Sequence, residues 1–488
     1  MSDPGDRPPL LAFAALAILV AGLLFVLYPR GAAYSDLLSL GAGYAGRAER
    51  TAAAAAYQEA TRRRPADPLP HQRLARLYLE WGRLDEALAS LSQAEQLDAD
   101  PEDIERLRVS AYVARAEAGV VGRPAEWEAA ARHARSLLAL DPSADEARHV
   151  LARAYLGVRA WDAAASVYEE LLGRDPEDAL AHERLGLLLL GEDSTALEHL
   201  AVAGTDLAEK ALAVYGEATA AENPAYGAIL IARLLMEREE WPLAAHQLQR
   251  AVADSPDYGE ASAYLGHALD RMGYPEGARN HLRRAVGEMP ESAVAHAFLG
   301  LHYDRLGDIA RARGHYETAY DLAPNNPAIC VEIGQTWVAE GRYEVAGVWL
   351  REAVSLQPEA PEFAEILARF YLDHTITSEG RAVEATEALL ALSPEDAVAH
   401  DLRGWAAVHF GDYEAAEKHL WRAIALDPQL ASAHYHLGVL RNDQGRQDEA
   451  DRAFARAVDL DTTGALSRLV ERARAARARP AGAPARRE

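Results

Sequence analysis

The sequence predicts an all-α fold, a solenoid of short helical repeats preceded by one long hydrophobic helix. Three consecutive segments within residues 259–358 share the same landmarks, and their closing prolines, Pro290, Pro324 and Pro358, follow one another at intervals of 34 residues. A self-similar period of this length is typical of solenoids, whose units bury their apolar faces by stacking on their neighbours. The hydrophobic helix is predicted from residues 10–28, LLAFAALAILVAGLLFVLY, which contain no charged residue.

Each of the three segments combines small residues, a turn residue and a helix terminator. In the middle segment, Gly300 comes early, Gly307 stands at a turn halfway along, and Ala312 and Ala319 follow. The early glycine and the alanines let neighbouring helices approach closely, while large side chains such as Tyr316 fill the space between them. The glycine at the turn accepts backbone angles that other residues avoid, and the closing proline ends the second helix.

These landmarks resemble the tetratricopeptide repeat (TPR), a helix–turn–helix unit of the same length. The resemblance covers residues 34–464, about eleven or twelve repeats, and implies a superhelical solenoid. In the first repeat, residues 41–46 also match G-x-G-x-x-G. A dinucleotide site requires a β-strand before this motif, whereas a hydrophobic helix and a short linker precede it here, so the repeat interpretation is preferred.

The period breaks once, and this break divides the array. Pro176 and Pro256 are 80 residues apart, 12 more than two repeats. We expect an extra or lengthened helix near residues 194–221, serving either as a binding insertion or as a joint between two subarrays. The predicted organisation is a tail (1–9), a transmembrane helix (10–28), an N-terminal subarray (34–190), an irregular helical insertion (191–224), a C-terminal subarray (225–464), and a capping helix with a basic tail (465–488).

The hydrophobic run predicts a single-pass membrane protein. Nineteen residues of helix span roughly 28 Å, close to the thickness of the hydrocarbon core. The short tail before the run favours a signal anchor with the repeats outside the cytoplasm. A cleaved signal peptide is the alternative, because Gly31-Ala32-Ala33 resembles a small-residue cleavage site.

Composition excludes several classes of function. The net charge of the 488 residues is −25, and Lys210 and Lys418 are the only lysines, so nucleic-acid binding is not expected. The single cysteine, Cys330, excludes an intramolecular disulfide framework and C-x-x-C metal motifs. We expect it to be a small buried residue inside a helix, with a reactive thiol as the alternative.

No catalytic constellation is present in the sequence. It contains no phosphate-binding loop, HExxH motif or nucleophile elbow. The nearest histidine pairs, His434 with His436 and His296 with His302, are badly spaced for sharing a metal on a helix. We therefore predict a protein that is not an enzyme and has neither a cofactor nor a metal site.

The candidate site follows from the family resemblance, which implies that the first helix of each repeat lines a concave groove. The ninth position of these helices is Arg76, Arg153, Arg233, His267, Gln335, Arg369 and Trp405 in seven repeats. The predicted partner-binding residues are Arg76, Arg153, Arg233, His267, Arg369 and Trp405. The arginines either bind acidic side chains or a carboxylate of a partner, or pair with acidic neighbours on adjacent helices. The Lys and Asn set of the family's chaperone-tail clamp is absent.

The predicted function is a membrane-anchored scaffold or assembly factor that binds protein partners, acidic or extended, in the concave groove. In this respect the chain resembles bacterial envelope-biogenesis TPR proteins with one N-terminal helix. The alternative is a substrate-recognition or export subunit of polysaccharide, lipid or glycosyl-transfer machinery, acting with a separate catalytic chain.

Overall fold

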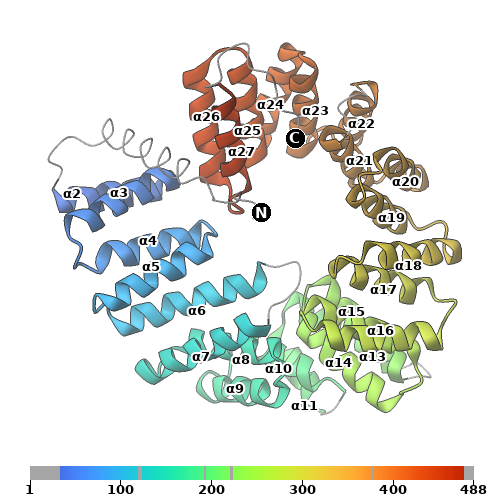
Figure 1. The fold of residues 1–488 in the computed structure, drawn as a ribbon. Coiled ribbons are helices and arrows are strands. Elements are labelled where there is room, and N and C mark those ends of the chain that lie inside the picture. The colour runs from blue at the N-terminus through green and yellow to red at the C-terminus, as the bar shows by residue number, and fades with distance from the viewer. Residues whose placement is uncertain (1–32, 119–123, 192–193, 220–223, 375–378, 478–488) are drawn as a thin grey trace, which may run out of the picture. The chain divides into compact units, whose positions relative to one another are not determined.

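The computed structural model describes residues 33–118, 124–191, 194–219, 224–374 and 379–477. Within these ranges the regular structure consists of 26 helices and contains no strand (Figure 1). The helices are α2 (Tyr34–Gly46), α3 (Arg50–Arg63), α4 (Leu69–Glu80), α5 (Leu84–Gln96), α6 (Pro101–Glu117), α7 (Pro124–Leu140), α8 (Asp145–Gly157), α9 (Trp161–Arg174), α10 (Ala179–Leu189), α11 (Thr195–Ala203), α12 (Asp206–Thr219), α13 (Pro224–Glu237), α14 (Trp241–Asp254), α15 (Gly259–Arg271), α16 (Pro275–Glu288), α17 (Ala293–Arg305), α18 (Ile309–Leu322), α19 (Pro327–Ala339), α20 (Tyr343–Leu356), α21 (Pro361–His374), α22 (Glu379–Leu392), α23 (Ala397–Phe410), α24 (Tyr413–Leu426), α25 (Ala431–Asp443), α26 (Gln447–Leu460) and α27 (Ala465–Arg477). The predicted all-α repeat solenoid is confirmed.

Close helix contact at small residues builds the hairpins, as the pair α17 and α18 shows. A Cβ added to Gly300 would lie 2.6 Å from Cε1 of Tyr316, whose side chain is only 1 % exposed. Glycine therefore leaves the room that the tyrosine ring occupies between the two helices. The same pairing of an early glycine with a large side chain recurs at Gly41 and Tyr57, Gly266 and Leu282, Gly334 and Leu350, Gly404 and Leu420, and Gly438 and Phe454.

The turns within the hairpins use a left-handed residue. Gly307, between α17 and α18, has φ +75°, which glycine adopts without steric cost. Where the repeat lacks a glycine, another residue takes the same conformation, as at Ala48 (φ 54°), Arg159 (φ 63°) and Glu239 (φ 59°). A side chain at positive φ is uncommon, so these turns need support from their surroundings.

The chain divides into two compact units. Unit 1 combines the described residues up to Leu107 with those from Gln429 onward, so it contains both the first and the last repeats of the array. Unit 2 comprises residues from Arg108 to Pro428, and the boundary falls inside α6. The largest hydrophobic core belongs to unit 2 and runs from Ala152 to Ile333.

One helix of unit 2, α12, stands outside the hairpin pattern. It follows the hairpin α10–α11 and contacts both of its helices, and it then packs on α13, the first helix of the next hairpin. Because a single unpaired helix separates the two hairpins, the hairpin α13–α14 is not stacked on its predecessor as in a regular array. Instead, α14 packs directly against α8 and α10 (Figure 1).

The structure contradicts the prediction of a single-pass membrane protein with extracytoplasmic repeats. None of the helices within the described ranges has both the length and the apolar character needed to cross a bilayer. The predicted span itself, residues 10–28, and the tail before it lie outside those ranges.

Cys330 lies inside α19, within a hydrophobic core of unit 2. Its side chain is fully buried and forms no disulfide. Burial raises the pKa of the thiol to about 11, so the thiolate needed for reaction is disfavoured at neutral pH. These observations match a small interior residue rather than a reactive one.

Candidate functional site

The contact between α14 and the earlier helices, together with the start of α16, is called here the fold-back. Arg159, in the turn before α9, donates from Nη2 to Oε1 of Gln249, 2.8 Å away. Gln247 donates to the carbonyl oxygen of Leu187 at 2.9 Å, and Arg250 donates to that of Leu190 at 2.8 Å. Regular repeats touch only adjacent units, so these bonds between separated hairpins mark the fold-back as a departure from the regular array.

The hydroxyl of Tyr274 and the ring of His246 add two further contacts to the fold-back. Tyr274, just before α16, donates to the carbonyl oxygen of Gly157 at 3.1 Å. The rings of Trp161 and His246 lie 5.0 Å apart. Both contacts join α14 or the start of α16 to the end of α8 and the start of α9, so the fold-back extends over several turns of helix.

A pocket of about 620 Å³ opens beside the fold-back. On one side of the pocket lie α8 and α10, each the first helix of its hairpin. On the other side lie the turn that precedes α14 and the turn that follows α15. Its lining contains four arginines, three glutamates, one histidine and two tryptophans. The residues are Ala116, Glu117, Trp127, His149, Val150, Arg153, Leu156, Gly157, Tyr168, Leu180, Arg184, Arg238, Glu239, Glu240, Trp241, Pro242, Arg271 and Met272.

Two of the arginines rest on tryptophan rings. The guanidinium carbon of Arg153 lies 5.6 Å from the ring centre of Trp127, and that of Arg271 lies 4.8 Å from the ring centre of Trp241. Such stacking restrains the planar guanidinium group while leaving its N–H edges available for hydrogen bonds. The pocket therefore holds two oriented cationic groups.

Ion pairs compensate three of the four arginines of the pocket. Nη1 of Arg153 lies 2.5 Å from Oε1 of Glu117, and Nη1 of Arg184 lies 2.6 Å from Oε2 of Glu240. Arg238 pairs with Asp206, outside the lining. The sequence left open whether the ninth-position arginines bind a partner or pair with acidic residues on adjacent helices. Arg153 forms such a pair, with Glu117 of α6.

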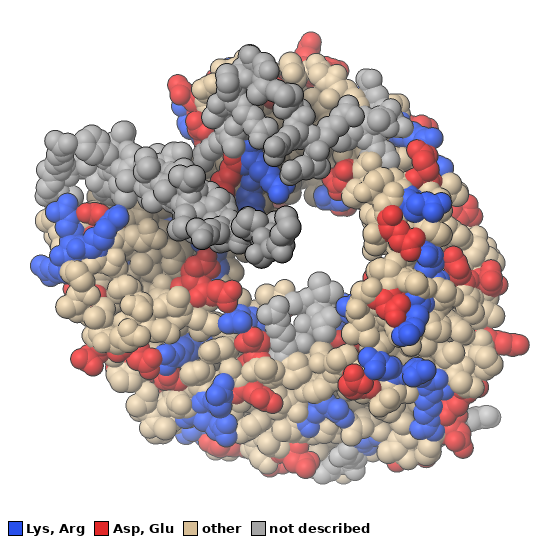
Figure 2. Space-filling model, viewed as in Figure 1, with Lys and Arg blue, Asp and Glu red and all other residues tan. Residues whose placement is uncertain are grey.

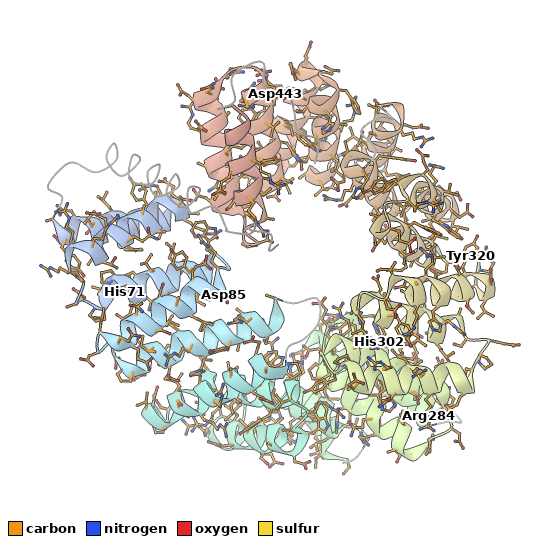
Figure 3. The ribbon with its side chains drawn as sticks, viewed as in Figure 1. His71, Asp85, Arg284, His302, Tyr320 and Asp443 are labelled. Atoms are coloured by element: carbon orange, nitrogen blue, oxygen red, sulfur yellow. The ribbon has the colours of Figure 1, made fainter. Side chains whose placement is uncertain are left out.

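Arg271 differs from these three arginines because the carboxylate beside it in the sequence, that of Asp270, is already occupied. Asp270 accepts a hydrogen bond from Nδ1 of the fully buried His302 at 3.0 Å and also binds Arg305. His302 is labelled on its helix in Figure 3. Within the described residues, Nε of Arg271 is buried and has no hydrogen-bond partner. Burial, and next the neighbouring Arg305, lower the pKa of Arg271, so a negative group placed here would be stabilised.

His149 supplies an acceptor to the same pocket. Its Nε2 lies 2.7 Å from Oδ2 of Asp178. A carboxylate can only accept, so Nε2 carries a hydrogen, and in the tautomer that this contact selects Nδ1 holds a lone pair. Nδ1 is buried and no group within the described part of the chain pairs with it. The pocket thus offers an unused donor and an unused acceptor.

The predicted site residues do not come together in this pocket, apart from Arg153. His267 packs behind it: its ring stacks on Phe298 with centroids 4.3 Å apart and meets Trp241 edge-on at 5.5 Å. Burial lowers the pKa of His267 to about 4, so the ring is neutral at pH 7.

The other predicted residues lie on separate helices. Arg76 is exposed on α4 in unit 1, and Arg233 is exposed on α13. Arg369 is exposed on α21, where it pairs with Glu365 at 2.8 Å. Trp405 is half-buried on α23, edge-on to His409. Basic and acidic side chains alternate over the visible face instead of separating into patches (Figure 2).

Sequence reasoning missed the half of the pocket that α14, α15 and the turns beside them supply. Trp241, Glu240 and Arg271 stand near the ends of their helices rather than at the ninth position used to choose candidates. The break in the period at residues 177–255 was the available signal. It located the irregularity but contained no information on which helices would meet across it.

Histidine pairs form a second recurrent arrangement that the sequence did not reveal. In each case a histidine early in the first helix of a hairpin bonds through Nδ1 to Nδ1 of a histidine in the second helix. The pairs are His182 and His199 (2.8 Å), His296 and His315 (3.1 Å), and His400 and His419 (3.0 Å). The sequence signal for these pairs is a spacing of 17 or 19 residues, which joins different helices, whereas His296 and His302 lie within one helix.

Comparison with protein-family models identifies the repeats. Models described as tetratricopeptide repeat match residues 71–101, 147–180, 229–293, 265–327, 305–370 and 402–465, which together cover more than half of the chain. The chain belongs to the tetratricopeptide repeat family. TPR proteins are in general non-catalytic scaffolds that bind other proteins.

Solved TPR structures resemble the chain in fold alone. The crystal structure of the Cut9–Hcn1 hetero-tetramer of APC/C is 15 % identical over 89 % of this chain and 98 % of the other, with a TM-score of 0.39. Yeast Tom70 is 16 % identical over 91 % and 96 %, with a TM-score of 0.38. PilF of Pseudomonas aeruginosa is 22 % identical over 44 % and 96 %, with a TM-score of 0.36. No curated protein sequence matched the chain.

Proposed function

We propose that this TPR protein is a non-catalytic scaffold that binds an acidic, extended segment of a protein partner, and that the segment places one carboxylate in the pocket beside the fold-back. The observation that carries the proposal is Arg271, whose guanidinium group is held on Trp241 and whose buried Nε lacks a partner within the described residues. A carboxylate would supply the missing acceptor and a further negative charge in one group.

The composition of the rest of the pocket suits a peptide more than a compact charged molecule. Glu117, Glu239 and Glu240 keep the net charge of the lining close to neutral, which disfavours a multiply charged ligand. Nδ1 of His149 is suited to accept a hydrogen bond from a peptide N–H. Trp127 and Leu180 offer apolar surface to an adjoining side chain.

The predicted groove residues enter this proposal as an extension of the same site. Arg153 lines the pocket, and an extended segment leaving it along the first helices of the repeats would pass exposed cationic positions such as Arg233. We propose that these residues, with Arg369 and Trp405, add weaker contacts to a long partner segment, and that Arg76 of unit 1 makes a separate contact with a partner.

The test uses a fluorescent peptide of alternating glutamate and glycine, with the glutamine version as its neutral counterpart. The full chain should bind the acidic peptide and not the neutral one, and Arg271→Glu should weaken binding at least ten-fold in fluorescence anisotropy. Arg311→Glu is the matched control, because Arg311 is exposed on α18 and does not line the pocket. Its affinity should equal that of the wild type.

A second variant separates the pocket from the wider groove. Combined replacement of Arg76, Arg153 and Arg233 by glutamate should weaken binding, with the circular dichroism spectrum unchanged. Equal affinity in Arg271→Glu and the wild type would contradict the pocket as the carboxylate site. Equal affinity in the triple variant would remove the groove arginines from the proposal.

A further inference from the structure

The first and last repeats of the array contact each other within unit 1. The start of α3 lies beside α26, although the two are about 400 residues apart in the sequence (Figure 1). Oδ1 of Asp459 accepts hydrogen bonds from the backbone N–H of Thr51 at 2.9 Å and from its hydroxyl at 2.7 Å. Arg50 donates from Nη1 to the carbonyl oxygen of Asp459 at 2.7 Å. This set of contacts is called here the terminal clasp.

Asp459 serves α3 as an N-cap does. The residue in the N-cap position of α3 is Glu49, whose side chain makes no capping hydrogen bond. The carboxylate of Asp459 binds the amide of the second residue of the helix instead, where it satisfies an exposed donor and complements the positive end of the helix dipole. The last repeat therefore supplies the hydrogen-bond acceptor that caps the N-terminus of α3 in the first repeat.

A second contact lies at the end of α4. Trp81, only 3 % exposed, donates from Nε1 to the carbonyl oxygen of Asp461 at 3.1 Å. The backbones approach so closely that a Cβ on Gly82 would lie 2.8 Å from the carbonyl oxygen of Thr462. Val458 packs against the hydrophobic cluster that contains Trp81. Apolar burial thus accompanies the polar contacts.

Hydrogen bonds to the side chain of Asp461 fix the conformation of the turn between α26 and α27. Oδ1 of Asp461 accepts from the N–H of Thr463 at 2.9 Å, and Oδ2 accepts from the N–H of Leu466 at 2.7 Å. The side chain of Asp461 thereby joins the end of α26 to the start of α27, while its backbone carbonyl faces Trp81. The last repeat offers a preformed surface to the first.

Repeat arrays need caps, because a terminal repeat otherwise leaves an apolar face with no neighbour. Helix α27 covers the last hairpin through Val470, which packs with Phe454 of α26. At the other end of the array, α26 and the turn after it cover the start of α3 and the end of α4. We propose that the last repeat is the N-terminal cap of the same chain, and that the terminal clasp prevents the first repeats from stacking on a second copy.

A disulfide test measures whether the clasp forms and within which chain. In a Cys330→Ala background, Thr51→Cys and Asp459→Cys place sulfur atoms where the present side chains are in hydrogen-bond contact, within reach of a disulfide after small movements. Mild oxidation of the full chain should give a cross-link between positions 51 and 459 in a product of monomer mass. The control pair Thr61→Cys and Asp459→Cys should not cross-link, since Thr61 lies at the other end of α3.

Two outcomes of this test would overturn the proposal. A product of dimer mass carrying the same cross-link would mean that the last repeat caps a second copy. Absence of any cross-link between positions 51 and 459 would mean that the contact does not form in solution. The assay reads the contact directly, so it does not depend on partner binding.

A charge reversal tests the consequence of opening. Asp459→Arg places a cation against the start of α3 and beside Arg50, so the clasp should release and the average mass in light scattering should rise with protein concentration. Asp448→Arg, at an exposed position on the same helix, should remain monomeric. Circular dichroism verifies that both variants fold. A folded Asp459→Arg variant that stays monomeric at every concentration would contradict the capping role.

Discussion

The regular repeats α15–α20 and the fold-back around α8–α14 are held together by different interactions. In the regular stretch, glycine or alanine meets a large apolar side chain, as Gly300 meets Tyr316, and each helix contacts its neighbours in sequence. In the fold-back, side chains reach across separated hairpins to backbone carbonyls, as Gln247 does to Leu187. The first kind of contact repeats along the chain, whereas the second depends on one unpaired helix.

This difference explains where the pocket lies. Stacked hairpins bury their apolar faces continuously, and such packing leaves little internal space. At α12 the succession of hairpins is interrupted, and polar and aromatic residues from the start of α14, the end of α15 and the adjoining turns line the pocket together with α8 and α10. The irregular element thus brings together residues that a uniform array would keep apart.

Overpacking the regular stretch should have the largest effect. Gly300→Leu would place Cβ alone 2.6 Å from the Tyr316 ring, closer than real contacts allow. Overpacking typically lowers the free energy of unfolding by about 1–3 kcal/mol, and we expect a value near the top of that range. Part of this loss is offset, because glycine inside a helix is less stabilising than other residues by about 1 kcal/mol.

The damage should remain local, because repeats couple mainly to their nearest neighbours. Limited proteolysis should first cut near residues 290–325 and leave resistant fragments on both sides. Gly314→Ala is the control, since a Cβ there meets nothing within 4 Å. Uniform loss of protection along the array in Gly300→Leu would contradict this description of the regular stretch.

A polar substitution in the fold-back should have a smaller effect. Gln247→Met keeps the size of the buried side chain but removes the donor to the Leu187 carbonyl, so the free energy of unfolding should fall by about 1 kcal/mol. Hydrogen exchange should quicken in α10 and α14 while α17–α20 keep their protection. An equal rise in hydrogen exchange in α10 and α14 and in α17–α20 would contradict the independence of the fold-back and the regular repeats.

Acidification should weaken the histidine pairs that join the two helices of a hairpin. His400 gives its Nε2 hydrogen to the carbonyl of Pro394 at 3.1 Å, so its Nδ1 accepts from Nδ1–H of His419 when both rings are neutral. Burial, and next His400, lower the pKa of His419 to about 4. The stabilisation is therefore complete above the unfolded value of about 6.5 and is lost as the pH falls toward 4.

The measurement is the thermal midpoint between pH 7 and pH 4.5. Replacing both His315 and His419 by glutamine should make the midpoint depend less steeply on pH, because burial also lowers the pKa of His315. His71→Gln measures the contribution of burial alone, because burial lowers the pKa of His71 as well but none of the three pairs named above contains it. It should reduce the slope less than the double variant does. An unchanged slope in the double variant would exclude the pairs as the origin of the acid sensitivity.

The fold could be predicted because its determinants are local and repeat. Gly300, Gly307 and Tyr316 act within one hairpin, and their counterparts recur at a constant interval, so one sequence contains many copies of the same evidence. The wrong membrane prediction came from a single segment with no such repetition. Its basis was the length of the segment and its lack of charge, and no described helix supports a spanning protein.

The candidate site was far less predictable, because its contacts are neither local nor periodic. Arg153 could be chosen from its place in the repeat, and it does line the pocket. Arg271 stands at the end of α15, and its role depends on Asp270 being taken by His302 and Arg305 from another repeat. Which side chain binds Asp270 depends on the positions of the helices in three dimensions, and the sequence alone does not give those positions.

The cap on α3 has a consequence for the order of events during synthesis. Thr51 leaves the ribosome 408 residues before Asp459, and at elongation rates of about 5–20 residues per second the delay is roughly 20–80 s. Throughout that time the start of α3 and the indole of Trp81 lack the groups that later cover them. The first repeats of a nascent chain therefore depend on their own short hairpins, or on a chaperone, until the end of the same polypeptide arrives.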